Sequence, residues 1–139
     1  MILGLDISTS ITGVTVIDKT GTCIYNEMWD TRNKNHFPTL YHKAKSIKDK
    51  LTCLKDRFLI EEIYIEQSLQ SFRSGFSSAQ TLSTLSRFNG IVSWQCYEMF
   101  DKQPEMLAAS SARKLVGIKV KKGEKAKEKS FHFVLANEP

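Results

Sequence analysis

The first 29 residues hold two short apolar stretches, and after them a segment in which hydrophobic and polar residues alternate. A short apolar run is typical of a buried strand, and an alternation with a period of two is typical of a strand that buries one face. These patterns predict strands over residues 2–7, 13–18 and 22–29, and the KTG stretch at 19–21 has the composition of a hairpin turn. Three consecutive strands with short links predict an antiparallel meander.

From Leu40 the spacing of the hydrophobic residues changes to that of a helix. Intervals of 4, 3, 4, 3 and 4 separate Leu40, Ala44, Ile47, Leu51, Leu54 and Phe58. This spacing defines one face of an amphipathic helix. The opposite face carries lysines that we expect to be solvated: Lys43, Lys45, Lys48 and Lys50.

The second half of the chain alternates between short strands and helices. We predict a strand at 63–65, a helix at 78–100, a strand at 105–109, a helical turn at 110–115 and a helix at 124–136. Helices that follow strands indicate crossovers onto the faces of a mixed sheet, so the order β-β-β-α-β-α-β-α predicts an α/β fold. No linker divides the chain, which predicts a single domain over residues 1–139. Gly90 in the second long helix is expected to permit a close approach of its neighbours.

Composition places the chain among intracellular proteins without a membrane segment. No hydrophobic run reaches the roughly 18 residues that a membrane helix needs. The N-terminus has neither a basic segment nor a cleavage site, so no signal peptide is expected and the predicted location is the cytoplasm. The three cysteines are far apart and are expected to be reduced core residues: Cys23, Cys53 and Cys96.

Positive charge is concentrated near the C-terminus. Residues 113–129 hold eight Lys or Arg against two Glu, a local charge of +6, whereas the whole chain carries +5. The remaining residues are therefore close to neutral at −1. A segment of nearly one sign on a neutral protein favours a polyanionic partner such as DNA. The cations expected to bind DNA are Arg113, Lys119, Lys121, Lys122 and Lys125.

Two acidic residues lie where predicted strands end. Asp6 closes the first strand, and Glu66 follows the strand at 63–65. If these strands are neighbours, the two carboxylates face each other at one edge of the sheet. Mg²⁺ prefers oxygen ligands and keeps several waters, so a few carboxylates and a substrate phosphate suffice to bind it. The pair therefore predicts a Mg²⁺ site, with Mn²⁺ as a substitute, for phosphodiester chemistry. Taken singly, Asp6 could also be a turn residue and Glu66 a surface charge.

Several stretches resemble the RuvC-like Holliday junction resolvases of the ribonuclease H-like superfamily. They are ILGLDISTSITGVTVID at the start, IYIEQ at the fourth strand, TLSTLSRFNGIVSWQCYEM in the second helix and SSARKLVGIKVKKGEKAKEKSF. The resemblance implies a ribonuclease H-like five-stranded mixed sheet, three antiparallel strands and then parallel ones, flanked by helices. It also implies that Asp6 and Glu66 are catalytic metal ligands, and that a homodimer cuts branched DNA.

The resemblance also raises expectations about two regions where the chain departs from the family. The loop after Glu66 is longer than in bacterial members; Leu69 matches their aromatic wedge by count, while Phe72 and Phe76 supply the aromatic chemistry. Phe72, next to Arg73, is expected to stack on a base of an opened junction. The family's last two carboxylates lie on a C-terminal helix that has no match here. We therefore expect a C-terminally incomplete domain that binds branched DNA and cleaves it weakly or not at all.

Two other functions are compatible with the same pattern. A non-catalytic nucleic-acid-binding module of this fold would bind DNA without Mg²⁺ and would not cut it. An actin-like ATPase or tRNA-modification-type domain shares the strand and helix order, and the DISTS stretch is close to a phosphate loop. That class needs a second lobe to enclose a nucleotide and gives no reason for the basic segment.

Overall fold

The structure, a computed structural model, describes residues 1–67 and 78–137 of the chain. The chain divides into two compact units, Met1–Met106 and Leu107–Pro139. The first unit contains β1 (Ile2–Asp6), β2 (Ile11–Ile17), β3 (Cys23–Asp30), α1 (Leu40–Arg57), β4 (Glu62–Glu66), α2 (Ala79–Phe100) and the first two residues of β5 (Glu105–Leu107). The second contains α3 (Ala109–Leu115) and α4 (Ala126–Asn137). The predicted order of strands and helices is confirmed.

The sheet of the first unit is mixed, with the strand order β3-β2-β1-β4-β5. β1 pairs antiparallel with β2, β2 pairs antiparallel with β3, and β1 pairs parallel with β4. Side chains alternate along each strand, so Leu3 and Leu5 are buried on one face while Gly4 and Asp6 belong to the other. The predicted five-stranded α/β sheet, antiparallel first and then parallel, is confirmed.

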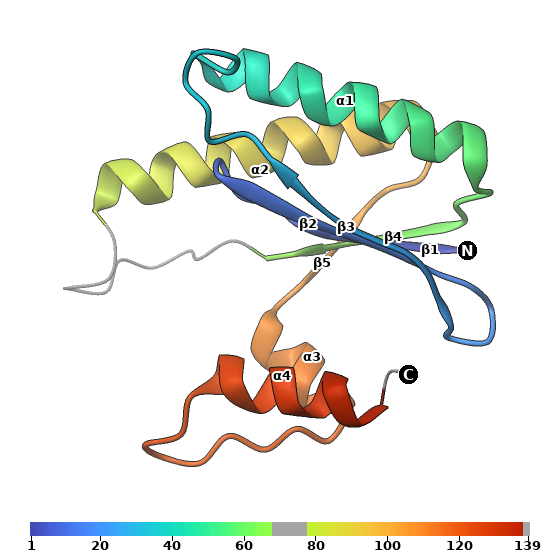
Figure 1. Cartoon of the computed structure of the whole chain (residues 1–139), viewed down its shortest axis with the longest axis vertical. Coiled ribbons are helices and arrows are strands. Elements are labelled where there is room, and N and C mark those ends of the chain that lie inside the picture. Colours follow the sequence, from blue (N-terminus) through green and yellow to red (C-terminus); the bar gives the residue numbers. More distant parts are fainter. Residues whose placement is uncertain (68–77, 138–139) are drawn as a thin grey trace. The chain divides into compact units, whose positions relative to one another are not determined.

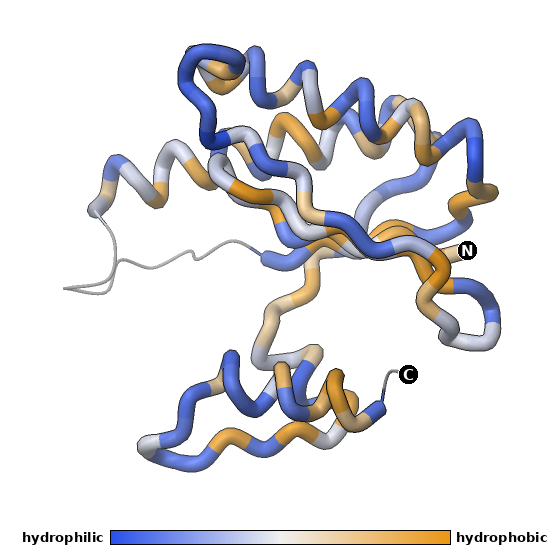
Figure 2. The backbone as a smooth tube through the Cα atoms, viewed as in Figure 1, coloured by the Kyte–Doolittle hydropathy of each residue, from blue (hydrophilic) through white to orange (hydrophobic). Residues whose placement is uncertain are grey.

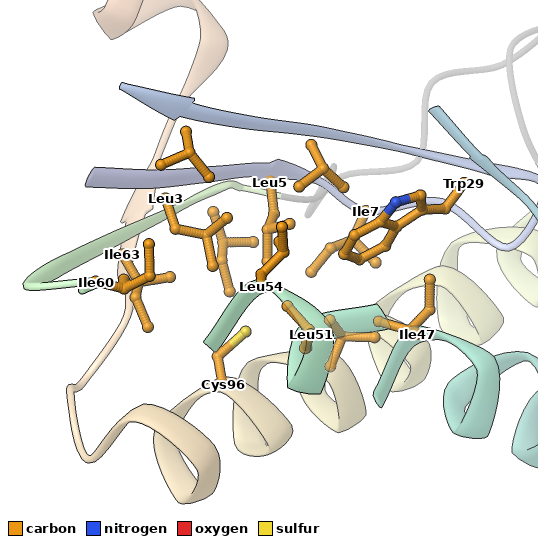
Figure 3. Packing of buried hydrophobic residues seen from close by; sticks show 14 of the residues in the cluster. Leu3, Leu5, Ile7, Trp29, Ile47, Leu51, Leu54, Ile60, Ile63 and Cys96 are labelled. Carbon is orange, nitrogen blue, oxygen red and sulfur yellow. The ribbon is translucent and has the colours of Figure 1, made fainter. Parts of the chain in front are cut away.

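Both helices of this unit lie on the same face of the sheet (Figure 1). The hydrophobic spacing that predicts α1 is also visible as patches along the helix in Figure 2. The core between the helices and the sheet is shown in Figure 3 and includes Leu3, Leu5, Ile7, Val14, Val16, Trp29, Ile47, Leu51, Leu54, Ile63, Ile65, Phe88, Val92 and Cys96. Full burial of such a side chain stabilises a fold by about 1.5–3 kcal/mol. This core holds in place the sheet that carries Asp6 and Glu66.

The edge strand β3 is tied to α1 by aromatic and charged side chains. The Glu27 carboxylate accepts hydrogen bonds from the Tyr25 hydroxyl and from Trp29 Nε1, the latter at 3.0 Å. Lys50 Nζ lies 5.9 Å from the centre of the Trp29 ring, and the Arg57 guanidinium lies 5.4 Å from that of Tyr25. The hydrogen bond from Tyr25 is the largest of the influences that lower the pKa of Glu27. A charged residue on an edge strand also discourages pairing with other strands.

Three sequence expectations about the first unit are wrong in part. Only Cys96 is a core residue, because Cys23 and Cys53 are exposed, although all three are free thiols. A Cβ added at Gly90 would meet nothing within 4 Å, so this glycine permits no close approach. β2 begins at Ile11 rather than at residue 13, because the buried Thr12 extends the inward face of the strand.

The second unit is a pair of helices joined by a basic loop. At the end of α3 the Ile118 N–H donates to the Arg113 carbonyl at 2.9 Å, and the Gly117 N–H to the Lys114 carbonyl at 3.2 Å. This is a Schellman motif, and Gly117 adopts its left-handed conformation at φ 84°. That the two units form a single domain over residues 1–139 stays a prediction.

Candidate functional site

The strand register brings Asp6 and Glu66 next to each other. Leu5 of β1 pairs with Ile65 of β4, and Asp6 and Glu66 are the next residue of each parallel strand. Neighbouring strands lie about 4.8 Å apart, and residues at the same register position point to the same face. Both acidic residues are exposed. The predicted adjacency of the two strand ends is therefore confirmed, whereas the role of the two residues as metal ligands stays a prediction.

A glycine flanks Asp6 on its other side. Gly13 of β2 is the antiparallel partner of Asp6, and a Cβ built at Gly13 would lie 3.6 Å from the Asp6 Cβ. A side chain at this position would occupy the space beside the carboxylate. Across β2, β1 and β4, the row at this register thus consists of Gly13, Asp6 and Glu66, which leaves the two carboxylates open to solvent on this face of the first unit.

The turn that follows Asp6 is held by hydrogen bonds from inside the unit. The Thr12 hydroxyl donates to the Ser8 carbonyl at 3.2 Å and accepts from the Ser8 N–H at 3.4 Å. The Thr31 hydroxyl donates to the carbonyls of Thr9 and Ser10, at 3.2 and 3.3 Å. Lys43 Nζ of α1 also donates to the Thr9 carbonyl. Lys43 is therefore not the purely solvated lysine that the helical spacing indicates.

Sequence reasoning missed this group of residues, although one signal was available. Thr12 shares the inward parity of Val14 and Val16 on β2, so a buried hydroxyl was to be expected there. No local pattern identifies Lys43, because its partner lies 34 positions away.

An exposed ion pair stands at the end of β3. Arg32 Nη2 lies 2.7 Å from Asp30 Oδ2, and Arg32 Nε donates to both carboxylate oxygens of Asp30. These hydrogen bonds are the main cause that lowers the pKa of Asp30 to about 2. Asp30 is therefore engaged with Arg32 rather than with the pair at Asp6 and Glu66.

The acidic pair has the donor chemistry of a Mg²⁺ site. Carboxylate oxygens are hard ligands, and two of them leave most of the octahedral positions of Mg²⁺ to water and to phosphate oxygens. Within residues 1–67 and 78–137, no group of three or more His, Cys, Asp or Glu side chains is arranged to hold a metal ion. Asp6 and Glu66 are the two carboxylates that β1 and β4 bring together, and their role as metal ligands stays a prediction.

The five cations of the segment 113–129 that are predicted to bind DNA belong to the second unit. Arg113 lies in the last turn of α3 and is partly buried, whereas Lys119, Lys121 and Lys122 are exposed in the loop between α3 and α4. Lys125 is exposed too, and its Nζ lies 3.3 Å from Glu128 Oε1.

Glu124 shapes this loop. It lies 2.6 Å from Lys129 Nζ and accepts the Lys121 N–H at 3.3 Å, and the hydrogen bond with Lys129 is the largest of the influences that lower its pKa. Three of the five predicted cations, Lys119, Lys121 and Lys122, thus extend from one loop and make no ion pair with any residue that the structure describes.

The predicted stacking residues lie outside the described residues. Phe72 and Arg73 fall in the segment 68–77, as do Leu69 and Phe76, and their role stays a prediction. Of the helices in the part of the chain that is described, none is both long and apolar enough to cross a membrane.

Comparison with known proteins identifies the fold. No family model and no curated protein matches the chain. Among solved structures, Thermus thermophilus RuvC in complex with a Holliday junction substrate aligns with a TM-score of 0.68 and 13% identity, over 84% of this chain and 69% of that one. A second Thermus thermophilus RuvC structure gives 0.65 and 18%, over 97% of this chain and 78% of the other. The yeast mitochondrial Holliday junction resolvase Ydc2 gives 0.58 and 12%, over 97% and 60%.

The chain therefore has the fold of the RuvC-like resolvases, as the sequence resemblance implies. At 12–18% identity, the alignments establish the fold and not the reaction. The chemistry has to be argued from the acidic pair and the basic loop of this chain.

Proposed function

We propose that the protein is a Mg²⁺-dependent, structure-specific DNA endonuclease that cuts four-way junctions or related branched DNA. The observation that carries the proposal is the adjacency of Asp6 and Glu66 at the carboxyl ends of the parallel strands β1 and β4. The same fold occurs in a RuvC structure that holds a Holliday junction. An exposed acidic pair at the carboxyl ends of two inner strands, together with a basic loop in the same chain, is suited to a reaction on a polyanion.

In this proposal, the two carboxylates hold Mg²⁺ or Mn²⁺ and orient it toward a phosphodiester. A bound Mg²⁺ supplies Lewis acidity, which activates water and stabilises charge on the phosphate oxygens. A divalent cation between Asp6 and Glu66 would offset the repulsion between their negative charges. The absence of a side chain at Gly13 keeps the approach to Asp6 open for substrate.

The basic loop supplies affinity for the DNA backbone in this scheme. Lys119, Lys121 and Lys122 are exposed and lie within a stretch of four positions of one loop. Lysines that contact phosphates release counterions, and this contribution is independent of base sequence. Recognition of branched DNA would then come from shape rather than from base contacts.

We also propose that the protein works as a homodimer, because a four-way junction offers two equivalent strands to be cut. The exposed face of α2 carries Trp94 and Tyr97, whose ring centres are 5.7 Å apart and whose exposed fractions are 60% and 44%. Aromatic side chains are enriched in protein interfaces. Trp94→Ala should therefore weaken self-association in sedimentation velocity, while Tyr41→Ala, at an exposed tyrosine of α1, should not.

A nicking assay on a synthetic four-way junction tests the proposed function. We expect cleavage that requires Mg²⁺ or Mn²⁺ and that is lost in Asp6→Asn and in Glu66→Gln. Asp49→Asn and Glu61→Gln make the same changes at exposed positions away from the sheet edge and should cut as the wild type does. Junction binding without cutting by the wild type under any divalent cation would instead identify a non-catalytic binding module.

A further inference from the structure

We propose that Lys43 is a positioning residue for the acidic pair: it holds the turn at Ser8–Ser10 in the conformation that directs Asp6 toward Glu66. The inference rests on the proposed function, since it assigns a supporting role at that same site. The argument depends on which hydrogen bonds the turn makes, on the burial of the groups that make them, and on the element that supplies the lysine.

The carbonyl groups of the turn are all engaged from within the unit. The Ser8 carbonyl accepts from Thr12, and the Ser10 carbonyl accepts from the Thr31 N–H at 2.8 Å and from its hydroxyl. The Thr9 carbonyl, at the centre of the turn, accepts both from the Thr31 hydroxyl and from Lys43 Nζ. The backbone that follows Asp6 is therefore restrained through the hydrogen bonds that its carbonyl groups accept.

The burial of these hydroxyls indicates that the arrangement is specific. Thr12 and Thr31 have exposed fractions of 0% and 1%, and Asn89 is the only other buried polar residue within residues 1–67 and 78–137. A buried hydroxyl costs free energy unless it is hydrogen-bonded. Both threonines direct their hydroxyl bonds to the turn after Asp6.

Lys43 adds the charged member of this group, and it comes from a rigid element. A hydrogen bond from an ammonium group to a carbonyl is stronger than one between neutral groups. Lys43 is partly buried on α1, next to the core residue Ala44, whereas Lys45 and Lys48 on the same helix are exposed. The helix packs on the sheet through its core face, so its position relative to β1 is fixed. A site is held more accurately when such an element supports its ligands.

The test compares three variants of the full chain. Lys43→Met keeps most of the side-chain stem and removes the donor, Lys43→Arg keeps the charge and the donors, and Lys45→Met makes the matched change on the exposed side of α1. Hydrogen exchange followed by mass spectrometry reads the turn, where the Ser8 and Ser10 amides are both hydrogen-bonded. Calorimetric titration with Mn²⁺ reads the acidic pair in the absence of DNA.

We expect Lys43→Met to speed exchange in the turn and to weaken Mn²⁺ binding about tenfold, the scale on which groups behind metal ligands act. Lys43→Arg should restore both values, and Lys45→Met should match the wild type. Unchanged exchange or unchanged Mn²⁺ affinity in Lys43→Met overturns the inference, because Lys43 is then at most a structural contact. If the wild type binds no Mn²⁺, the proposed function itself is wrong. If the wild type and the Lys43→Met variant bind Mn²⁺ equally, only the role of Lys43 is wrong.

Discussion

Removal of the unpaired lysines of the basic loop should change the salt dependence of DNA binding by a predictable amount. The change replaces Lys119, Lys121 and Lys122 by alanine. These side chains are exposed and make no ion pair among the residues described, whereas Lys125 and Lys129 are paired with glutamates. The Lys121 N–H that bonds Glu124 belongs to the backbone, so the substitution leaves the contact that shapes the loop intact.

The magnitude follows from counterion release. Each phosphate contact contributes about 0.9 to the slope of log K against log salt for duplex DNA, so three contacts account for about 2.7. A rise in salt from about 0.05 M to about 0.2 M changes log salt by about 0.6, so the wild type should lose about 40-fold more affinity than the variant over this range.

Fluorescence anisotropy with a labelled four-way junction at several salt concentrations measures both slopes. The matched control removes three exposed lysines of α1, at positions 45, 48 and 55, which changes the net charge equally. We expect the loop variant to have the smaller slope and the control to stay close to the wild type. Equal slopes for the wild type and the loop variant, or a larger loss in the control, would refute the assignment of the DNA surface to the loop.

Three further predictions concern the fold and its ionisable groups. Gly90→Ala should stabilise the protein by about 1 kcal/mol, measured by urea unfolding, because the added methyl group meets nothing within 4 Å; a loss of stability would contradict this. Arg32→Gln should raise the pKa of Asp30 from about 2 toward its model-compound value of 3.8 in an NMR titration. Because that pKa is lowered in the folded state, the stability due to the pair should be present above about pH 4 and lost toward pH 2, and a pKa that does not move would exclude the ion pair in solution. Burial raises the pKa of Cys96 to about 12, so a thiol reagent at pH 8 should modify only the two exposed cysteines before unfolding.

The periodic parts of the sequence predict the fold well. The alternation through Leu3 and Leu5 and the spacing through Ile47, Leu51 and Leu54 identify faces that are in fact buried. The positions of Asp6 and Glu66 at strand ends follow from the same patterns. Their adjacency also requires that β1 and β4 are parallel neighbours. A crossover through α1 is compatible with this pairing, and the register of the two strands establishes it.

The contacts between distant parts of the chain could not be read from the sequence. Lys43 has the helical position of a solvated residue, and its bond to Thr9 depends on how α1 packs over the β1–β2 turn. Thr12 is polar, so the alternation rule removes it from β2, yet its bonds to Ser8 offset the cost of burial. The expectation that Gly90 permits a close approach is wrong, because a glycine in a helical segment does not show whether another element packs against it.

The parallel pairing of β1 with β4 also determines when the acidic pair exists during folding. Asp6 and Glu66 are 60 positions apart in the sequence, and β2, β3 and α1 lie between them. Contacts between such distant segments form only after the loss of chain entropy has been compensated, so they depend on the whole meander and on α1. When only β1 and β2 have left the ribosome, Asp6 is present but Glu66 is not. The candidate cation site therefore forms only after β4 has been made and has paired with β1, and a chain that ends before Glu66 has no such site.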